Sequence, residues 1–445
     1  MSGFDTAFHA TTTFAPPTSF EDFRRQLEPA WIEQALKATG TSTVRRRRLP
    51  SEQVVWVVLG MALYRDRPLK DIVTKLDLVM PGVPTTIARS SVAQARERVG
   101  SAPMKWLFEQ SARVWAERSA EAHRWRGLRV YGVDGSTIRV PDTEENRAEF
   151  GGQNGRGGTP SGYPMVRLAV LMVLRSHLLA AASFGRYERT SEHLYARPLL
   201  ESVPDNSLLV MDKGFFSASI LLGVERDHAE RHWLTRARSD LKADVVERLG
   251  PGDEIVQMAV SKDARAKDPS LPRTWQARRI RYEIEPGKPQ HLLTSLRDAT
   301  RFPAAEIVAL YHERWEIELG YDEIKTEMLD REEAIRSKKP DNVRQEIWGV
   351  LLAYNLVRLE MESIAREAKL PPTRISFIES LRLIRDEWWW SSATSPGAIP
   401  KRLATLRRNI KRYVLPPRRA RSYPRAVKIK MSNYARKRPD TAGAK

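Results

Sequence analysis

The period of the hydrophobic pattern changes twice along this chain, and this restricts the folds that the chain can adopt. Residues 1–125 show the apolar spacing of helices. β-rich runs begin at about residue 126, and helices return from residue 303 to about residue 390. Strands between two helical sections in a chain of 445 residues are typical of an α/β protein with two or three domains. We therefore expect an α/β fold that follows an all-helical N-terminal domain.

Strands and helices alternate in the middle of the chain. Strands are predicted for "LRVYGVDGSTIRV", for "MVRLAVLMVLRSHLLAAASF" and for the buried run "SLLVM" (207–211). Helices are predicted for "SEHLYARPLLESV" and "SASILLGVERDHAE". Residues 236–295 are strand-like, with Pro and Gly turns and no strong helix. The pattern predicts a mixed α/β core that a β-rich insertion interrupts.

Positive charge is concentrated near the ends of the chain. The net charge is +19, residues 401–445 hold 16 Lys and Arg against one acid, Asp440, and residues 45–48 are four arginines. This predicts binding to a polyanion, and nucleic acid is favoured over a membrane because no amphipathic lipid-binding helix accompanies the charge. The alternative for residues 401–445 is a solvated tail that only keeps the protein soluble. Charge of this kind gives non-specific binding.

Composition excludes several classes of protein. The chain has no cysteine, which excludes disulfide scaffolds and thiolate metal sites. The start "MSGFDTAFHATTTF" lacks the basic and apolar regions of a signal peptide. The longest apolar runs, such as "VVWVVLGMALY", are too short to cross a membrane. We therefore expect a soluble cytoplasmic protein, associated with the nucleoid, that has no membrane partner.

Three carboxylates stand at positions that suit chemistry. Asp134 is expected at the end of an apolar strand, Asp212 directly follows the strand 207–211, and Glu318 lies in a predicted helix. α/β proteins place their ligands at the carboxyl ends of strands. Other interpretations stay open, because "DG" at 134 is typical of a hairpin turn and Asp212 fits a helix N-cap, with Ser217 as a competing cap. Combined, the carboxylates would form an all-oxygen site for Mg²⁺ or Mn²⁺, and phosphoryl transfer commonly uses two such ions.

The segment "YHERWEIELGYDEIK" (311–325) is predicted to be a helix with a polar edge. On a regular helix Tyr311, Arg314, Glu318 and Lys325 fall within an arc of about 60°. A phenol, a guanidinium, a carboxylate and an ammonium group would then line the edge of a buried face. The alternative is an ordinary surface helix, on which Arg314 and Glu318 form an i,i+4 ion pair.

The same spacing carries a resemblance to a known family. In the signature of DDE-type transposases of the insertion sequence four family, a tyrosine, an arginine, a glutamate and a lysine are separated by two, three and six residues. Tyr311, Arg314, Glu318 and Lys325 match this spacing. "VDGSTIRVPDTEENRAEFG" resembles the segment of the family's first aspartate and "DKGFF" that of the second. "LLTS" and "SKKPDNVRQEIWGVLLAYNLVR", which flank the signature, resemble the family's last part, and the resemblance covers most of residues 20–365.

The resemblance implies an RNase H-like catalytic core with a β-rich insertion before the catalytic glutamate. It implies that Asp134, Asp212 and Glu318 are catalytic and hold two divalent ions, Mg²⁺ with Mn²⁺ as a substitute. Water would free a 3′-OH at the transposon end, and this 3′-OH would attack another phosphodiester. The implied partners are the terminal inverted repeats and the target, both double-stranded DNA, and a second copy of the chain in a homodimeric synaptic complex.

Four further positions receive a role from the resemblance. Tyr311, Arg314 and Lys325 would contact phosphates at the transposon end, with fork-like contacts from arginine and point-charge contacts from lysine. Relatives can hold a flipped base against a tryptophan just before the "LLTS"-like strand. This chain has Gln290 and His291 there, and Trp275 is the tryptophan of residues 236–295 that could take the role.

These expectations divide the chain into five parts. They are a helical DNA-binding domain (1–125), the first part of the RNase H-like core (126–235), a β-rich insertion (236–295), the second part of the core with the catalytic helix (296–400) and a basic tail (401–445). The predicted function is cut-and-paste transposition of an insertion sequence. The alternatives are a catalytically inactive or domesticated DNA-binding protein and another RNase H-like nuclease.

Overall fold

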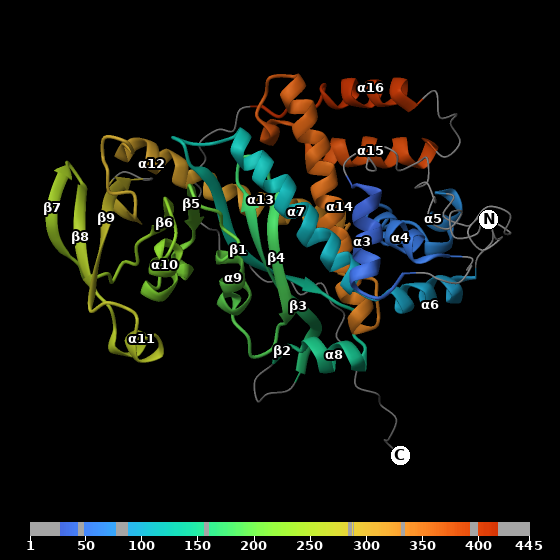
Figure 1. The fold of residues 1–445 in the computed structure, drawn as a ribbon, viewed down its shortest axis with the longest axis horizontal. Helices are drawn as coiled ribbons and strands as arrows, with labels where there is room; N and C mark the ends of the chain where they lie inside the picture. The colour runs from blue at the N-terminus through green and yellow to red at the C-terminus, as the bar shows by residue number, and fades with distance from the viewer. Residues whose placement is uncertain are drawn as a thin grey trace, which may run out of the picture.

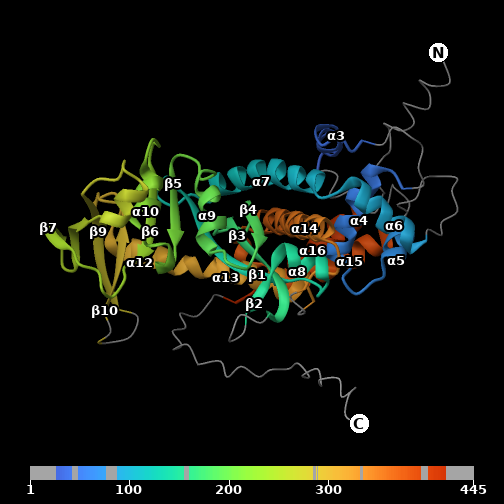
Figure 2. The same ribbon diagram turned by 90° about the horizontal axis from the view of Figure 1, so that it is seen from below.

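The computed structural model describes residues 27–416 except for 43–48, 77–87, 155–159, 284–286, 288, 331–333 and 392–398. Both views place a helical section at one end of the molecule and strands β7–β9 at the other (Figures 1 and 2). The helical section begins with α3 (Pro29–Ala38), α4 (Ser51–Leu63), α5 (Leu69–Lys75), α6 (Arg89–Val99) and α7 (Ala102–Ala122). The four arginines at 45–48 and the far C-terminus lie outside the described residues.

One mixed sheet forms the centre of the molecule. Its strand order is β2-β3-β1-β5-β6-β10-β9-β8-β7, and β4 pairs with β3. The strands of its first half are β1 (Arg129–Arg139), β2 (Gly152–Asn154), β3 (Pro160–Val173), β4 (Leu179–Arg186), β5 (Ser207–Met211) and β6 (Arg231–Arg236). The helices between them are α8 (Glu144–Phe150), α9 (Glu192–Leu200) and α10 (Ala218–Glu225).

The first half of the sheet has the strand arrangement of an RNase H-like fold. β1, β3 and β4 form an antiparallel meander, β5 pairs parallel with β1, and β6 pairs parallel with β5. Parallel neighbours need a crossover, and α9 and α10 lie in the connections that lead to β5 and β6. The predicted α/β, RNase H-like fold class is confirmed.

The strands of the predicted insertion extend the same sheet. β10 (Pro289–Thr294) pairs antiparallel with β6, and β9 (Thr274–Glu283), β8 (Asp253–Ala259) and β7 (Asp244–Gly250) follow in antiparallel order. The one helix described in this part is the short α11 (Lys262–Lys267), which agrees with the prediction of no strong helix there. It begins where the Ser261 side chain accepts a hydrogen bond from the Ala264 N–H.

Two hydrophobic clusters cover the two faces of the sheet. Alternate residues of β1 enter different clusters, because strand side chains point to opposite faces: Val130 and Ile138 join one, and Tyr131 and Val133 join the other. The first cluster also contains side chains from α4, α7 and the long helix α14 (Pro340–Glu367). The helical N-terminal section and the central sheet therefore share one hydrophobic core.

Close packing of α14 on α4 shows how tightly these parts are joined. A Cβ atom at Gly349 would lie 3.3 Å from the carbonyl oxygen of Val58 and closer still to its side chain. Only glycine allows the two helix backbones to approach this far. The boundary at residue 125 marks a change of secondary structure within a common core, and the division into domains stays a prediction.

The C-terminal helices correct the predicted extent of the basic tail. α15 (Phe377–Ser391) is followed by α16 (Ile399–Ile410), and Leu403, Leu406 and Ile410 of α16 are buried in the first cluster. Three cations of this region are paired: Arg402 with Glu387, Arg407 with Glu360 and Lys411, just beyond the helix, with Glu367. Residues 401–416 are thus part of the fold, because apolar spacing that was hidden among the charges forms a helix face. Residues 417–445 lie outside the described residues.

No helix in the described ranges combines the length and the apolar character that are needed to cross a membrane.

Candidate functional site

Asp134 and Asp212 come from neighbouring strands and lie at neighbouring positions. The parallel pairing of β1 with β5 ends at Val133 and Met211, which face each other, and the two aspartates are the next residues of the two strands. Asp134 is not at a strand end, since β1 continues to Arg139 in antiparallel pairing with β3. This excludes the hairpin-turn interpretation, and the aspartates meet where the parallel pairing stops.

Asp212 has a local structural role as well. It caps the short 3₁₀ turn η2 (Lys213–Phe215), where its Oδ1 accepts a hydrogen bond from the Gly214 N–H. Ser217 makes no side-chain cap for α10. Asp212 is therefore an N-cap, as one interpretation of the sequence expected, but the element that it caps is the 3₁₀ turn η2. The cap uses one carboxylate oxygen, and a carboxylate can accept further partners at the other.

The segment that carries the sequence signature is not one regular helix. It consists of α12 (Ala304–Tyr311), a 3₁₀ turn η3 (His312–Arg314), α13 (Trp315–Asp322) and a π-helical turn η4 (Glu323–Met328). The arc expected for four side chains on an ideal helix does not apply, because Arg314 lies in the tight turn and Lys325 in the wide one. π turns of this kind are frequent at functional sites.

Arg314 and Glu318 form the ion pair that was the alternative interpretation of this segment. Nη2 of Arg314 is 2.8 Å from Oε1 of Glu318, and the two side chains are only 20% and 29% exposed. The pair does not lie on an open surface. Burial raises the pKa of Asp134, and the positive charge of Arg314, which lies close by, offsets part of this rise. Burial raises the pKa of Tyr311 to about 12, and the charges of Arg314 and Asp212 also act on this phenol.

Two contacts hold α13 on the sheet beside Asp134. The Tyr321 hydroxyl donates a hydrogen bond of 2.7 Å to the backbone carbonyl oxygen of Asp134. Gly320 faces β3 so closely that an added Cβ would collide with the end of the Met172 side chain and come within 3.3 Å of the Tyr354 hydroxyl. Glu318 is thus brought towards the aspartates because a glycine and a hydrogen-bonding tyrosine follow it in the sequence.

A buried network of charged side chains fixes the π turn. Glu323 forms an ion pair with Arg358 of α14, and its Oε2 accepts a hydrogen bond of 2.8 Å from the Tyr354 hydroxyl. His177, which is 1% exposed, accepts a hydrogen bond of 2.6 Å at Nδ1 from Arg358, so its Nε2–H donates to Glu316 at 2.7 Å. Burial alone would raise the pKa of Glu323, but the positive charge of Arg358 and the hydrogen bond from it lower this pKa to about 2.

Asp134 has a further acidic neighbour that the sequence did not indicate. Burial raises the pKa of Asp134 to about 7, and the negative charge of Glu192, at the start of α9, raises it further against the hydrogen bond from the Gly135 N–H. Glu192 packs directly on Gly135, and its Oε1 is buried without a hydrogen-bond donor. No sequence pattern connects the two carboxylates, because they meet only through the packing of α9 on β1.

The donor chemistry of this site fits divalent cations. Asp134, Asp212 and Glu318 offer only oxygen ligands, which Mg²⁺ and Mn²⁺ prefer. The pKa of Asp134 is raised because its negative charge is poorly compensated, and a cation would compensate it. Within the residues that the structure describes, no three acidic or histidine side chains stand close enough to hold one ion. Glu318 is engaged by Arg314 instead.

The remaining predicted residues have different surroundings. Lys325 is half-buried in the π turn. Trp275 is 7% exposed and packs against Trp233 in the second cluster, with 5.7 Å between ring centroids. Trp275 thus lies in the core, and its role in holding a flipped base stays a prediction. The indole that is exposed near the site is Trp315, which is 54% exposed and directly follows Arg314. The sequence indicated this residue only as a tryptophan that stands among polar residues in the segment 311–325.

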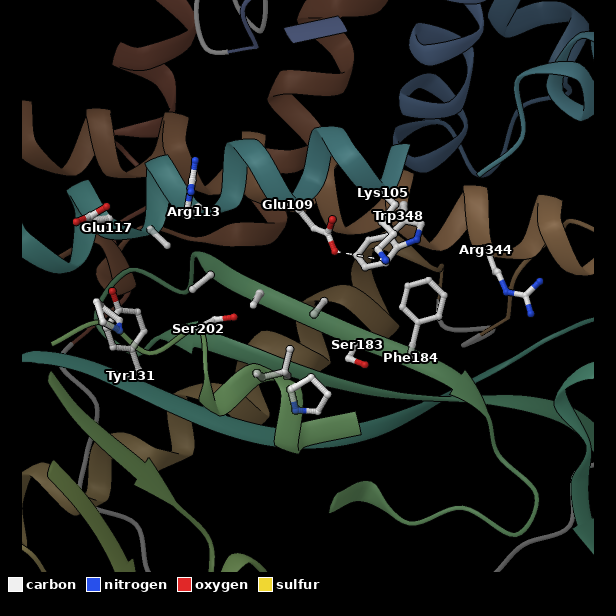
Figure 3. A pocket seen from close by; sticks show the side chains of 17 residues that line it. Lys105, Glu109, Arg113, Glu117, Tyr131, Ser183, Phe184, Ser202, Arg344 and Trp348 are labelled. Carbon is white, nitrogen blue, oxygen red and sulfur yellow. Dashed lines mark ion pairs between the residues drawn. The ribbon is translucent and has the colours of Figure 1, made fainter. Parts of the chain in front are cut away.

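A large cavity lies away from these residues. It has a volume of about 740 Å³ between α7, β4 and α9 and is lined by side chains such as Glu109, Arg113, Phe184 and Trp348. Figure 3 shows the polar side chains of α7 along one wall and β4 along the other. No predicted site residue lines it. The acidic site is a cluster at the edge of strand pairing and not a deep pocket.

Comparison with known proteins identifies the family. The model described as "Insertion element 4 transposase N-terminal" matches residues 17–109, and the model "Transposase DDE domain" matches residues 125–356. The transposase InsG for insertion sequence element IS4 of Escherichia coli (strain K12) is 42% identical over 420 residues, or 94% of this chain and 93% of InsG. InsZ of the same strain is 35% identical over 285 residues, or 61% of this chain and 92% of InsZ.

Among solved structures, the piggyBac transposase in a synaptic complex with hairpin DNA aligns with 95% of this chain and 91% of its own chain. The TM-score is 0.43 and the sequence identity 13%. The fold assignment does not depend on this alignment, since the strand order is RNase H-like. Because the DDE domain model spans more than half of the chain and InsG matches nearly all of it, the chain belongs to the insertion element 4 family of DDE transposases.

Proposed function

We propose that this DDE transposase cleaves the ends of its insertion sequence and joins them to target DNA with Asp134, Asp212 and Glu318 as its catalytic carboxylates. The observation that carries the proposal is the neighbouring position of the two aspartates on β1 and β5, with the pair of Arg314 and Glu318 beside them. An inactive DNA-binding protein would have no need for three carboxylates at one edge of the core.

The proposed cofactors are two divalent ions, Mg²⁺ or Mn²⁺ in its place, held by these three carboxylates. Such ions activate the attacking oxygen and stabilise the leaving oxygen of a phosphodiester. The protein contributes the positions of the ligands. β1 and β5 fix the aspartates, and the Tyr321 hydroxyl fixes α13 against the backbone of Asp134.

Arg314 couples DNA binding to the assembly of this site. Without DNA its guanidinium neutralises Glu318 at 2.8 Å. A phosphate of the transposon end can take over the guanidinium, since arginine binds phosphate with two parallel hydrogen bonds. Glu318 then loses its partner and is available to join the two aspartates. Tyr311 and Lys325 would contact other phosphates around the scissile bond.

We expect Arg314→Lys to reduce end cleavage by about 100-fold, because lysine keeps the charge but loses the planar fork that positions the phosphate. Lys325→Arg should have a smaller effect, since a point charge tolerates a longer side chain of equal charge. Cleavage and strand transfer are measured on intact and pre-nicked ends. The control is Arg382→Lys, at a 64% exposed side chain of α15.

The opposite pattern would reverse these two roles. If Arg314→Lys cleaves normally and Lys325→Arg is inactive, the fork at Arg314 is not the group that positions the scissile phosphate.

The proposed partners are the terminal inverted repeats and target DNA, bound by a homodimer in the synaptic complex, and we place the protein at the nucleoid in the cytoplasm. The high positive charge supports contact with DNA. Residues 417–445 alone hold ten Lys and Arg against one acid, Asp440. The cations of α16 contribute less than the sequence suggests, because several of them are paired with glutamates.

We expect deletion of residues 417–445 to make DNA binding less dependent on salt. Each phosphate contact that is lost should reduce the slope of log K against log salt by about 0.9. Binding to a duplex of random sequence is measured between 50 and 200 mM salt, as rough bounds of the range in which such slopes are read. An unchanged slope would mean that this segment serves solubility only.

The proposed function is tested by incubating the purified protein with the two ends of its own element and Mg²⁺. The expected products are cleaved ends with a 3′-OH, followed by insertion into a second DNA. Binding without cleavage would support an inactive DNA-binding protein. Cleavage of branched or unrelated DNA in preference to the ends would support another RNase H-like nuclease.

A further inference from the structure

A second cavity lies where the N-terminal helices meet the catalytic core. Its volume is about 500 Å³, and α4, the start of α5, α6 and residues 336–337 line it. Both ribbon views show α4, α5 and α6 side by side (Figures 1 and 2). Most of its polar lining is cationic: Arg67, Lys70, Arg89, Arg96 and Arg336.

Two of these arginines are fixed from behind by the core. Arg336 donates hydrogen bonds to the backbone carbonyl oxygens of Met61, Arg65 and Arg67, at 2.9, 3.1 and 3.1 Å. Arg96, which is 5% exposed, donates to the Gln345 side chain at 2.9 Å and to Ser337 Oγ at 2.9 Å. Their positions do not depend on a ligand.

The positive charge at this junction exceeds the negative charge. Glu346 is fully buried and forms ion pairs with Arg65 at 2.5 Å and with Arg336 at 3.9 Å. Burial lowers the pKa of Arg336, and repulsion from Arg65 and Arg96 adds to the effect of burial. Glu346 is the buried carboxylate beside these guanidinium groups, while Asp66 acts on Arg336 and Glu97 on Arg96 from more exposed positions. An anion in the cavity would add to this compensation.

Lys70 and Arg89 bring the charge to the surface. Both are exposed, and neither has an ion pair with any residue in the described ranges. None of the described residues that line the cavity is acidic. The chemistry of the lining fits a phosphate group, because arginine binds phosphate through its fork and lysine through a point charge.

We propose that this basic cavity binds the phosphodiester backbone of DNA, so that one stretch of the duplex contacts the N-terminal helices and the catalytic core together. The proposal rests on the proposed function and adds a contact surface to it. Lys70 and Arg89 make the outer phosphate contacts, and Arg96 and Arg336 supply fixed charge behind them. The contact is independent of base sequence, as backbone contacts are.

The test uses the full-length double variant Lys70→Ala/Arg89→Ala. Both side chains are exposed, so the fold should be retained, which circular dichroism and the thermal midpoint check. Binding is measured on a duplex of random sequence and on the ends of the element, as log K against log salt. The slope should become shallower by about 2 on both duplexes, because two phosphate contacts are lost.

The matched control is the double variant Arg366→Ala/Lys369→Ala. These exposed cations lie at or just beyond the C-terminal end of α14, about 30 Å along the helix from Gln345 at 1.5 Å per residue. The control variant removes the same amount of positive charge. Its slope of log K against log salt should stay within about 0.5 of the wild-type slope, which corresponds to about half a phosphate contact. An unchanged slope in the Lys70/Arg89 variant, or an equal change in the control, overturns the proposal.

A further comparison separates DNA from free phosphate. The thermal midpoints of wild type and variant are measured in sodium phosphate and in sodium chloride of equal ionic strength. Stabilisation of wild type alone by phosphate, together with an unchanged DNA slope, would assign the cavity to a free anion and overturn the DNA contact. Cleavage of the ends by wild type is scored separately, so failure of the proposed function is distinguished from failure of this inference.

Discussion

Loss of any one of the three carboxylates should reduce end cleavage at least about 1,000-fold, a cost of about 4 kcal/mol in the transition state. Asp134→Asn, Asp212→Asn and Glu318→Gln keep the size of each side chain but remove the negative charge that a divalent ion needs. DNA binding should be retained, since it depends mainly on cationic groups. The readouts are single-turnover cleavage in Mg²⁺, DNA affinity, and the affinity of the DNA-bound protein for Mn²⁺.

The matched control is Asp240→Asn, which removes one carboxylate at a 70% exposed side chain between β6 and β7. It should cleave like wild type. A variant of Asp134, Asp212 or Glu318 that cleaves at nearly the wild-type rate would show that the residue is not a catalytic ligand. Asp212→Asn needs one further check of stability, because this carboxylate also caps the turn η2.

The second large effect is expected from the buried network behind α13, the helix that carries Glu318. Arg358→Met should destabilise the protein by about 3–5 kcal/mol, because Glu323 keeps its buried charge but loses its cation. Arg358 is 1% exposed and contacts Glu323, His177 and Tyr354. The free energy of unfolding is measured in urea at neutral pH. End cleavage should also fall, because Glu323 belongs to the π turn that continues α13.

The double variant Arg358→Met/Glu323→Gln provides the control. It removes both charges, so it should recover much of the lost stability, as buried ion pairs that are replaced as a unit often do. A double variant that is less stable than Arg358→Met alone would show that Glu323 is not the source of the cost. Recovery of stability without recovery of cleavage would show that the network also positions Glu318.

The network also predicts a dependence of stability on pH. The pKa of Glu323 is lowered from 4.5 to about 2 in the folded protein. A lowered pKa means that the ionised carboxylate stabilises the fold, and that this contribution is fully present above pH 4.5. It is lost as the pH falls from 4.5 towards 2. Glu323→Gln should show a smaller loss of stability than wild type over the same acid range.

The sequence by itself determined the family, the fold class and the identity of the site residues that we propose. The run 207–211 is β5 as predicted, because four consecutive apolar residues (208–211) bounded by polar ones suit a buried strand. The spacing from Tyr311 to Lys325 carried the resemblance to the DDE family, and this family is confirmed by comparison. These features are local, and each can be recognised without its tertiary partners.

The tertiary structure alone decided how these residues meet. The register that makes Asp134 and Asp212 neighbours is a property of strand pairing between segments far apart in the chain. The 3₁₀ and π turns replace the regular helix that periodicity predicts, because Glu323 is held in the buried network of Arg358 and His177. Long-range partners of buried charges decide such geometry, and no local pattern encodes them.

Two features of the packing that the sequence did not indicate have the same cause. Trp275 is in the core because alternate residues of β9 face the second cluster, and residues 401–416 are folded because the apolar side of α16 packs on the core. The sequence shows correctly that the first segment contains a tryptophan and that the second is rich in cations. Whether a tryptophan or a run of cations reaches the solvent depends on which face the rest of the chain covers, and only the packed structure determines that.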